Sequence, residues 1–303
     1  MANREKLIRR MQEDRIEYLL AQFVDIHGSP KVKIVPVSSI DDMIDDGAGF
    51  AGAALWGMGQ GPHSHDMSAR VDVDTYTPLP WREGVARFAS DLYVDGEPYM
   101  FCPRQNLKRA LAGARGDGFV FNVGMEPEHF LVTRNGDGSI SVWDPADVDS
   151  LDKPCYDFKG ISNVMDYLQD MMDGLNRLCW GGYQADHEDA NGQYEINFDY
   201  ADALTTADRY TFFKMMSSQY ALKRGAIATH MAKPFTDRTG SGAHIHFHLA
   251  DAETGENVFL DESDPRGLGL SQTAYHFIGG IMAHGRATCA VTSPTVNCYK
   301  RLQ

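Results

Sequence analysis

The chain has 303 residues, 43% of them hydrophobic, which is enough for one large core or for a small domain beside a larger one. Its 42 acidic and 28 basic residues give a formal net charge of -14, which repels nucleic acids and anionic membrane surfaces. We therefore expect two domains, with neither a nucleic-acid nor a membrane partner.

The N-terminal residues and the cysteines indicate where in the cell the protein is located. Residues 1–15 alternate charged with apolar side chains, which is not the pattern of a signal peptide. No later stretch approaches the roughly 20 apolar residues of a membrane helix. The five cysteines are an odd number without CxxC spacing, so they predict neither a disulfide framework nor a zinc ribbon. We expect a cytoplasmic protein.

The first segment contains signals for a helix and a hairpin. The pattern predicts a short charged helix over 4–14. Apolar runs over 16–26 and 32–35 flank a turn at 27–30, which is typical of a β-hairpin.

A second hairpin is expected further along. The runs 86–94 and 98–102 flank Asp95-Gly96, a dipeptide that tolerates the positive φ of a tight turn. Residues 1–102 are therefore expected to form a small β-rich N-terminal domain, with residues 103–303 as a second domain.

A glycine-rich stretch over 47–61 is expected to be a surface loop. Within it Gly47, Gly49 and Gly52 spell GxGxxG, the spacing of a dinucleotide-binding turn. That turn must follow a strand and open a helix, whereas residues 38–46 have a helical pattern. We therefore expect no dinucleotide-binding fold here.

Beyond residue 103 the pattern changes to alternating helices and short strands. A helix over 162–178 carries an apolar stripe that is typical of core packing. The stripe consists of Val164, Leu168, Met171, Leu175 and Leu178. Thr205 and Asp208 resemble a capping box, and the helix that they open is expected to end near Gly225.

Glu126 and Glu128 lie two residues apart in an otherwise apolar run. On a strand, both carboxylates project from the same face. An exposed strand face is the simpler explanation, but the flanking Phe121, Val123 and Phe130 indicate a buried strand. Like charges this close in a buried strand need a cation.

The segment 184–198 offers His187, Glu188 and Glu195 around the turn-forming Asn191-Gly192. A hairpin would bring the two glutamates together. Carboxylates that converge from separate strands predict a metal site, and an all-oxygen site selects Mg²⁺ or Mn²⁺ over zinc.

A third element begins with the glycine loop 240–242 and continues as a strand. In this strand His244, His246 and His248 alternate with apolar residues, so their imidazoles share one face. A single histidine in a strand is usually a hydrogen-bonded residue without a ligand role, but three on one face are less easily explained in this way. The HxH spacing also occurs in zinc sites, so a zinc hydrolase is an alternative.

Together these motifs resemble those of the glutamine synthetase family. There, a GxEPE strand, an HE…GQxE hairpin, a KP…GxGxHxH loop and strand, and an NPT-N-YKR segment follow in this order, and all four occur here. The last motif reads Ser293-Pro294-Thr295-Val296-Asn297-Cys298-Tyr299-Lys300-Arg301. The resemblance implies an α+β fold: a β-grasp-like domain over 1–102 and a glutamine-synthetase-type catalytic domain of antiparallel sheet and helices over 103–303.

The resemblance also implies a centre with two or more divalent metals, Mg²⁺ or Mn²⁺. Glu128, Glu188 and Glu195 would match the ligands of one metal. Glu126 and His244 would match two ligands of a second metal.

Further residues match substrate groups in the family. Arg301 would be a catalytic arginine that grips the carboxylate of glutamate, a task that suits a planar guanidinium. Gly240 and His244 would lie in the substrate site, and His246 and His248 near the ATP phosphates. The implied reaction forms γ-glutamyl phosphate from glutamate and ATP, after which an amine displaces phosphate.

One departure from the family bears on the amine. Members that use ammonia carry Phe-Asp-Gly-Ser-Ser, whereas this chain has Phe50-Ala51-Gly52-Ala53-Ala54. The loss of the carboxylate and two hydroxyls leaves a small apolar wall, with Ala51 in place of the aspartate. We therefore favour methylamine as the substrate amine, in the branch of the family that joins methylamine to glutamate, with ammonia as the alternative.

A second departure is that the sequence stops at Gln303, directly after the YKR motif, whereas the family continues. This predicts an incomplete catalytic domain with little turnover if residue 303 is the true end. It also leaves open a non-catalytic relative that binds glutamate or nucleotide. The resemblance implies a homo-dodecamer of two stacked hexameric rings, with active sites between neighbouring subunits.

Overall fold

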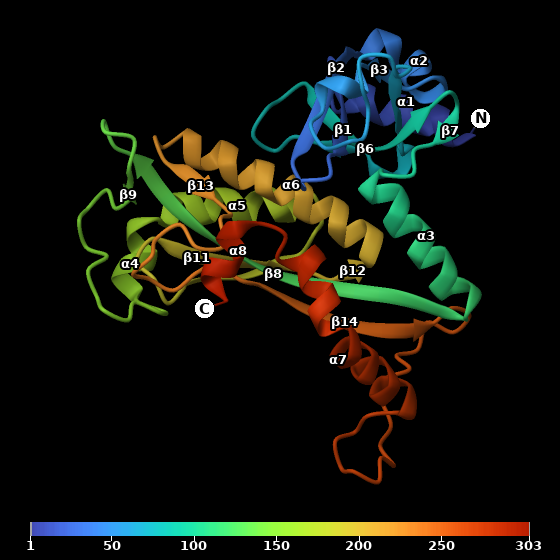
Figure 1. Ribbon diagram of the computed structural model, residues 1–303. Coiled ribbons are helices and arrows are strands. Elements are labelled where there is room, and N and C mark those ends of the chain that lie inside the picture. Colours follow the sequence, from blue (N-terminus) through green and yellow to red (C-terminus); the bar gives the residue numbers. More distant parts are fainter. Residues whose placement is uncertain (1, 303) are drawn as a thin grey trace. The chain divides into compact units, whose positions relative to one another are not determined.

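The computed structural model describes residues 2–302 (Figure 1). The chain divides into two compact units, Met1–Ala114 and Arg115–Gln303, and α3 (Pro103–Gly116) spans the division. Each unit combines helices with a sheet, so the expected α+β class is confirmed.

The sheet of the first unit has the strand order β2-β1-β6-β4-β3, and two short strands, β5 and β7, also pair with β6. The strands are β1 (Tyr18–Val24), β2 (Pro30–Pro36), β3 (Ala48–Phe50), β4 (Met67–Val71), β5 (Thr77–Pro78), β6 (Val85–Val94) and β7 (Glu97–Pro98). The helical segments are α1 (Ala2–Glu13), η1 (Val37–Ser39), α2 (Ile40–Asp45), η2 (Gly52–Ala54) and η3 (Val73–Thr75).

The first predicted helix and hairpin are confirmed in α1 and in the antiparallel pair β1 and β2. The turn between the strands depends on the buried Asp25, whose Oδ1 accepts hydrogen bonds from His27 N at 2.9 Å and Ser29 N at 3.0 Å. Gly28 lies within this turn and has a φ of 74°.

The second hairpin has the predicted turn, since Asp95 and Gly96 both have positive φ. The predicted strand over 98–102 is wrong, because β7 ends at Pro98. After one more bond from Tyr99 N to Leu92 O, the chain turns so that Cys102 N donates to Tyr99 O. Pro103 then begins α3, since its fixed φ suits the first turn of a helix.

The glycine stretch is only in part the surface loop that was expected, because β3 and η2 lie within it. The segment before it is α2, and the strand that contains Gly49, β3, lies inside the GxGxxG sequence instead of before it. The helical turn that follows β3 is η2, which has three residues. A dinucleotide-binding turn between a strand and a helix is therefore not formed here.

The second unit is built around β8 (Phe119–Arg134), a strand of 16 residues to which its neighbours pair antiparallel (Figure 1). The other strands are β9 (Ile140–Val142), β10 (Gly182–His187), β11 (Gln193–Phe198), β12 (Ala201–Asp202), β13 (Ile227–Thr229) and β14 (Ala243–Asp251). The helices are α4 (Phe158–Asn163), α5 (Met165–Arg177), α6 (Ala203–Leu222), α7 (Gln272–Thr292) and α8 (Val296–Arg301).

The helix predicted over 162–178 is two helices, α4 and α5. Val164 breaks the helix, with φ of -116° and ψ of 15°. Val164, Leu168 and Met171 are buried as the stripe predicts, whereas Leu178 is only half-buried. In Figure 1, α5 and α6 lie side by side over β8 and β11, and this layer encloses the core of the unit.

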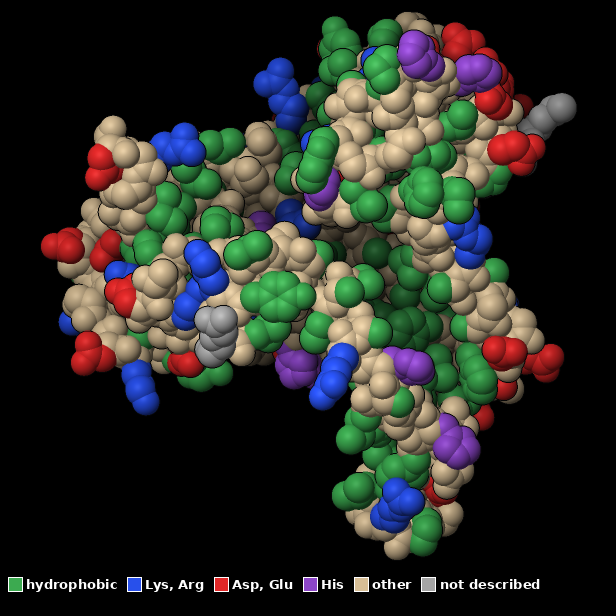
Figure 2. All heavy atoms as spheres, viewed as in Figure 1, with side chains coloured by type: hydrophobic (Ala, Val, Ile, Leu, Met, Phe, Trp, Pro, Cys, Tyr) green, Lys and Arg blue, Asp and Glu red, His purple; other side chains and the backbone are tan. Residues whose placement is uncertain are grey.

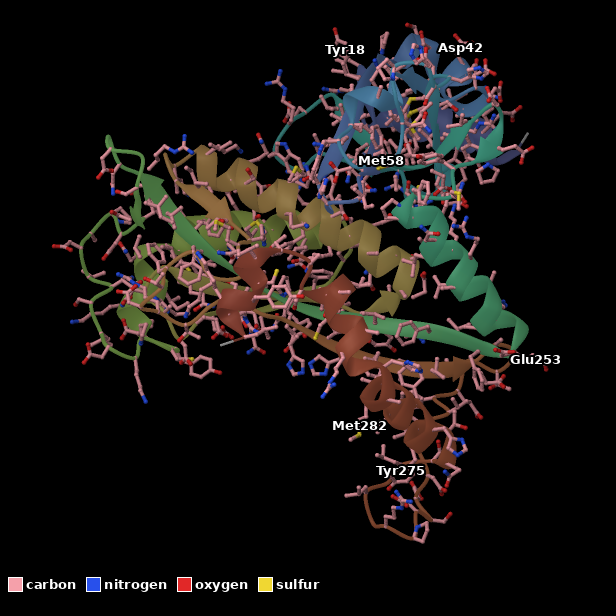
Figure 3. All side chains as sticks on the ribbon, viewed as in Figure 1. Tyr18, Asp42, Met58, Glu253, Tyr275 and Met282 are labelled. Atoms are coloured by element: carbon pink, nitrogen blue, oxygen red, sulfur yellow. The ribbon has the colours of Figure 1, made fainter. Side chains whose placement is uncertain are left out.

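α7 differs from these packed helices. Among its residues, Ala274 is the buried one, while Ile278, Ile281 and Met282 are exposed. Figure 2 shows hydrophobic side chains over this part of the surface, and Figure 3 labels Met282 on the helix. α7 therefore presents an apolar face to solvent.

The capping box predicted at Thr205 and Asp208 is wrong. α6 begins three residues earlier, because Asp202 caps it: Asp202 Oδ1 accepts hydrogen bonds from the backbone N of Leu204 and Thr205, both at 3.1 Å. The predicted end is confirmed, since α6 stops at Leu222 and Gly225 has a φ of 72°.

We expect Asp202→Ala to lower the free energy of unfolding by about 1 kcal/mol, because it removes the cap of α6. Thr205→Ala, by contrast, is expected to be neutral, since Thr205 lies inside the helix. Urea unfolding of both variants measures the difference. A larger loss at Thr205 than at Asp202 would contradict this assignment.

Candidate metal and substrate site

β8 places two carboxylates next to two different partner strands. Glu126 lies opposite His244 of β14, and Glu128 lies opposite Glu195 of β11. Because alternate residues of a strand share a face, both glutamates project to the same side of the sheet, as predicted. Two clusters of candidate metal ligands form around them.

The first cluster contains Glu128, Glu188 and Glu195, each half-buried, with one carboxylate oxygen per residue and these oxygens within 4.8 Å of one another. The predicted hairpin of β10 and β11 supplies two of them, and Glu188 directly follows β10. Three carboxylates suit Mg²⁺ or Mn²⁺, which prefer oxygen ligands.

The carboxyl groups of this cluster hold their protons more tightly than usual. Burial raises the pKa of Glu195 to about 7, with a further contribution from the charges of Asp186 and Glu188. Burial and the charge of Glu128 likewise raise the pKa of Glu188. Burial also raises the pKa of Glu128, although the hydrogen bond from Gly242 N and the positive charge of Arg301 oppose this rise.

The second cluster contains Glu126, His244 and His246. Glu126 Oε2 lies 3.1 Å from His244 Nδ1, and Glu126 Oε1 lies 3.1 Å from His246 Nε2. The two imidazole rings have centroids 4.5 Å apart. A carboxylate with two imidazoles is a mixed donor set that accepts Mn²⁺ as well as zinc.

His248 and His187 lie apart from both clusters. His248 Nε2 lies 3.1 Å from Asn122 Nδ2, one repeat further along β14. His187 is completely buried, and its Nε2 lies 2.9 Å from Asp149 Oδ2, which also accepts a hydrogen bond from Gly192 N at 2.7 Å. Burial alone would lower the pKa of His187, but the bond to Asp149 raises it. This pair fixes the turn of the hairpin that supplies Glu188 and Glu195.

The glycine loop brings Arg301 beside the first cluster. A Cβ added at Gly242 would lie 2.9 Å from Arg301 Nη2 and 2.9 Å from Glu128 Oε1, so both side chains approach this backbone closely. Gly242 N also donates to Glu128 Oε2 at 2.9 Å. At Gly240 an added Cβ would clash with Ala232 O and lie 3.1 Å from Arg301 Cγ. The third and fourth motifs therefore meet at Glu128.

Ala51 belongs to the first unit. It is exposed and directly precedes η2. Its neighbours Ala53 and Ala54 are exposed as well, so this stretch forms a small apolar surface.

Two residues beside the first cluster, Asp186 and Gln193, were not predicted from the sequence. Asp186 lies opposite Glu195 on β10, and its Oδ1 is buried without a hydrogen-bond partner. Burial raises its pKa. Asp186 lies two residues before Glu188, which is the same spacing that identified Glu126 and Glu128. Gln193 is completely buried and donates from Nε2 to Glu128 Oε2 at 2.6 Å.

A cavity of about 310 Å³ adjoins the second cluster. It offers aromatic side chains beside the carboxylate of Glu126 and the imidazole of His246. The lining residues are Gly124, Met125, Glu126, Tyr183, Phe198, Asp199, Tyr200 and His246. Tyr183 and Tyr200 were not predicted, because neither belongs to a periodic pattern or motif in the sequence.

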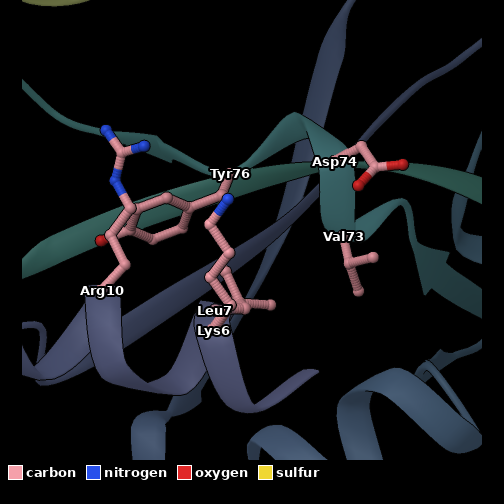
Figure 4. A pocket seen from close by; sticks show the side chains of 6 residues that line it. All are labelled: Lys6, Leu7, Arg10, Val73, Asp74 and Tyr76. Atoms are coloured by element: carbon pink, nitrogen blue, oxygen red, sulfur yellow. The ribbon is translucent and has the colours of Figure 1, made fainter. Parts of the chain in front are cut away.

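Another cavity, of about 290 Å³, lies in the first unit (Figure 4). Lys6, Leu7 and Arg10 of α1 face Val73, Asp74 and Tyr76 across it. Tyr76 donates to Asp14 Oδ2 at 2.8 Å, and burial raises the pKa of its phenol. None of its lining residues belongs to the four motifs.

Comparison with known proteins places these motifs in a family. Residues 100–303 match the glutamine synthetase catalytic domain. The chain is 45% identical over 293 residues to a glutamate–methylamine ligase of Methyloversatilis universalis, covering 96% of this chain and 65% of the relative. It is 41% identical over 291 residues to a glutamine synthetase of Rhizobium meliloti, with the same 96% and 65% coverage.

The chain therefore belongs to the glutamine synthetase family, as the motifs predict. A solved GmaS/ADP complex has the same fold, with 43% identity and a TM-score of 0.91 over 97% of this chain and 66% of that one. The chain thus spans about two thirds of the length of its relatives. Enzymes of this family use ATP and divalent metals. Within residues 2–302, no helix is both long and apolar enough to cross a membrane.

We expect the affinity for Mn²⁺ to rise with pH through about 7, because the raised pKa of Glu195 makes a proton compete with the metal. Glu195→Gln should weaken Mn²⁺ binding by at least about tenfold and flatten this pH dependence. Isothermal titration between about pH 6 and 8 measures both effects.

Glu253→Gln is the matched control, since Glu253 is exposed on the loop after β14 (Figure 3). This variant should bind Mn²⁺ like the wild type. Equal Mn²⁺ affinity in the Glu195 and Glu253 variants would refute the assignment of the first cluster.

Proposed function

We propose that the chain carries the metal and glutamate site of an ATP-dependent ligase that joins the γ-carboxylate of L-glutamate to methylamine through γ-glutamyl phosphate. The observation that carries the proposal is the pair of ligand clusters on β8, with Arg301 beside one of them. The family and the 45% identity to a glutamate–methylamine ligase support it.

The donor atoms of both clusters fit divalent cations. Glu128, Glu188 and Glu195 would hold one Mg²⁺ or Mn²⁺, and Glu126 with His244 would hold a second, with His246 as a further donor or a contact to ATP phosphates. Such ions, when bound, neutralise the charges of carboxylate and phosphates and stabilise the transferring phosphoryl group.

The other residues would position the reactants. The guanidinium of Arg301 suits the substrate carboxylate, because its fork of donors matches two carboxylate oxygens. The cavity beside Glu126 and His246 suits the nucleotide, since Tyr183 and Tyr200 offer aromatic surface for a base. We assign this cavity to ATP, with His248 at its edge through its contact with Tyr200, whose ring centroid lies 5.5 Å away.

The amine loses a proton during the second step. Asp186 suits the role of acceptor, because its Oδ1 is buried without a partner next to Glu195 and burial raises the pKa of its carboxyl group. The apolar Ala51 stretch offers no group that attracts ammonium more than a methylated amine. The Ala51 stretch therefore favours methylamine, whereas a proton acceptor serves either amine.

The direct test is the amine preference. We expect γ-glutamylmethylamide, ADP and phosphate as products, and a kcat/KM for methylamine at least about tenfold above that for ammonium. Mass spectrometry and coupled ADP release measure these quantities. A preference for ammonium would show the alternative function, a glutamine synthetase, which the 41% identity to such enzymes keeps open.

Ala51→Asp tests the origin of this preference. Restoring the carboxylate should shift the ratio of kcat/KM values toward ammonium by about tenfold. Ala112→Asp, at an exposed alanine of α3, is the control and should leave the ratio unchanged. Equal ratios in both variants would remove Ala51 from the specificity site.

Metal content separates the remaining candidates. Two Mn²⁺ or Mg²⁺ per chain support the ligase, one tightly held zinc would support a hydrolase, and nucleotide binding without turnover would support a regulatory relative. The dodecamer and the cytoplasmic location stay predictions.

A further inference from the structure

Two motif residues that have no role in the proposed chemistry, Lys233 and Asn297, are joined by a pair of hydrogen bonds. Lys233 N donates to Asn297 Oδ1 at 2.8 Å, and Asn297 Nδ2 donates to Lys233 O at 2.9 Å. The two residues are 64 positions apart in the chain. One side-chain amide thus satisfies both polar groups of one backbone residue.

The residue after Lys233 explains why this pairing is possible. Pro234 excludes the helical conformation at Lys233 and favours an extended one. In an extended residue, N–H and C=O point to the same side, as they do in a hydrogen-bonded pair of an antiparallel ladder. The amide of Asn297 therefore takes the place that a neighbouring strand would occupy. A carboxylate at this position could accept from Lys233 N but could not donate to Lys233 O.

The same helix connects this anchor to the substrate site. Asn297 and Arg301 are four residues apart in α8, so they lie on one face of the helix. Asn297 is half-buried against Lys233, and Arg301 packs its Cγ against Gly240 and its guanidinium against Gly242. The segment 233–242 is thus bound to α8 at its beginning and contacted by α8 at its end.

The middle of the segment is held from the other side. Lys233 Nζ donates to Arg238 O, and Arg238 Nη1 donates to Asn191 O at 3.5 Å in the turn of the β10 and β11 hairpin. The ring of Phe235 lies 5.6 Å from that of Phe130 on β8. The segment therefore has a fixed position on the sheet. The two hydrogen bonds of Asn297 fix the position of α8 relative to this segment.

We propose that Asn297 is a positioning residue: its amide fastens the segment 233–242 to α8 and so holds Arg301 beside Glu128, where the carboxylate of the substrate binds. This inference rests on the proposed function in assigning glutamate to Arg301. It predicts that Asn297 affects the affinity for glutamate and leaves the metal clusters intact.

The test compares Asn297→Ala, which removes both hydrogen bonds, and Asn297→Asp, which removes the donor, with Asn135→Ala. Asn135 is the matched control, because its Nδ2 also makes two hydrogen bonds, to Ser139 Oγ at 2.8 Å and Ser141 Oγ at 2.9 Å, in the exposed turn after β8. Seven residues of extended chain separate it from Glu128, roughly 20 Å.

Three measurements are made on each variant of the 303-residue chain. Hydrogen exchange reports the backbone of 231–242, titration reports Mn²⁺ affinity, and a second titration with Mn²⁺ and a non-hydrolysable ATP analogue reports glutamate affinity. Both Asn297 variants should exchange faster in 231–242 and bind glutamate about tenfold more weakly, with Mn²⁺ affinity within about twofold of wild type. Asn135→Ala should match the wild type in all three.

Unchanged exchange in 231–242, or unchanged glutamate affinity in both Asn297 variants, overturns the proposal. A parallel loss of Mn²⁺ affinity also overturns it, because that result indicates a general structural role. A wild-type chain that binds Mn²⁺ but no glutamate would contradict the proposed function instead, and the exchange data would still decide whether Asn297 holds the segment.

Discussion

Repulsion between carboxylates is the constraint on which the site depends. Glu128, Glu188 and Glu195 bring oxygen atoms within 4.8 Å of one another. Two unit charges 4 Å apart repel by about 4 kcal/mol at an effective dielectric constant of 20, so three charges cannot share this space without compensation. Burial, with a further contribution from the neighbouring carboxylates, raises the pKa of Glu195 to about 7, so retention of a proton is one form of compensation. A divalent cation provides the other, and it also leaves the carboxylates ready to orient anionic reactants.

The surrounding structure keeps these groups from moving apart. β8 fixes the spacing of Glu126 and Glu128 through its pleat, and the buried pair of His187 and Asp149 fixes the hairpin beside it. Gln193 then holds one oxygen of Glu128 from a completely buried position. Because these supports are a long strand and hydrogen bonds from buried residues, the site is organised before any ligand binds.

The sequence predicted those parts of the site that follow from strand periodicity. Glu126 and Glu128 project together because a strand repeats every two residues, and the turn at Asn191-Gly192 brings Glu188 to Glu195. Asp186 has the same two-residue spacing from Glu188, but the sequence pointed instead to its neighbour His187, because histidine is a common metal ligand. In the structure His187 is buried and paired with Asp149. Tyr200 could not be recognised, since its place beside the cavity depends on how β11 leads into β12.

Helix and strand ends were less predictable, because local alternatives compete. Asp202 and Thr205 are both good capping residues, and the choice depends on where β12 releases the chain into α6. Val164 is apolar in a helical pattern, yet its backbone leaves the helix between α4 and α5. The strand expected after Asp95-Gly96 stops at Pro98, because the chain turns from Tyr99 to Cys102 after one last bond to Leu92.

The central claim is that two metal ions bind along β8. Anomalous scattering from crystals soaked in Mn²⁺ tests it most directly. We predict two anomalous peaks per chain, one among Glu128, Glu188 and Glu195 and one between Glu126 and His244. Peaks that lie away from both clusters, or the absence of any peak at the first cluster, would contradict the account.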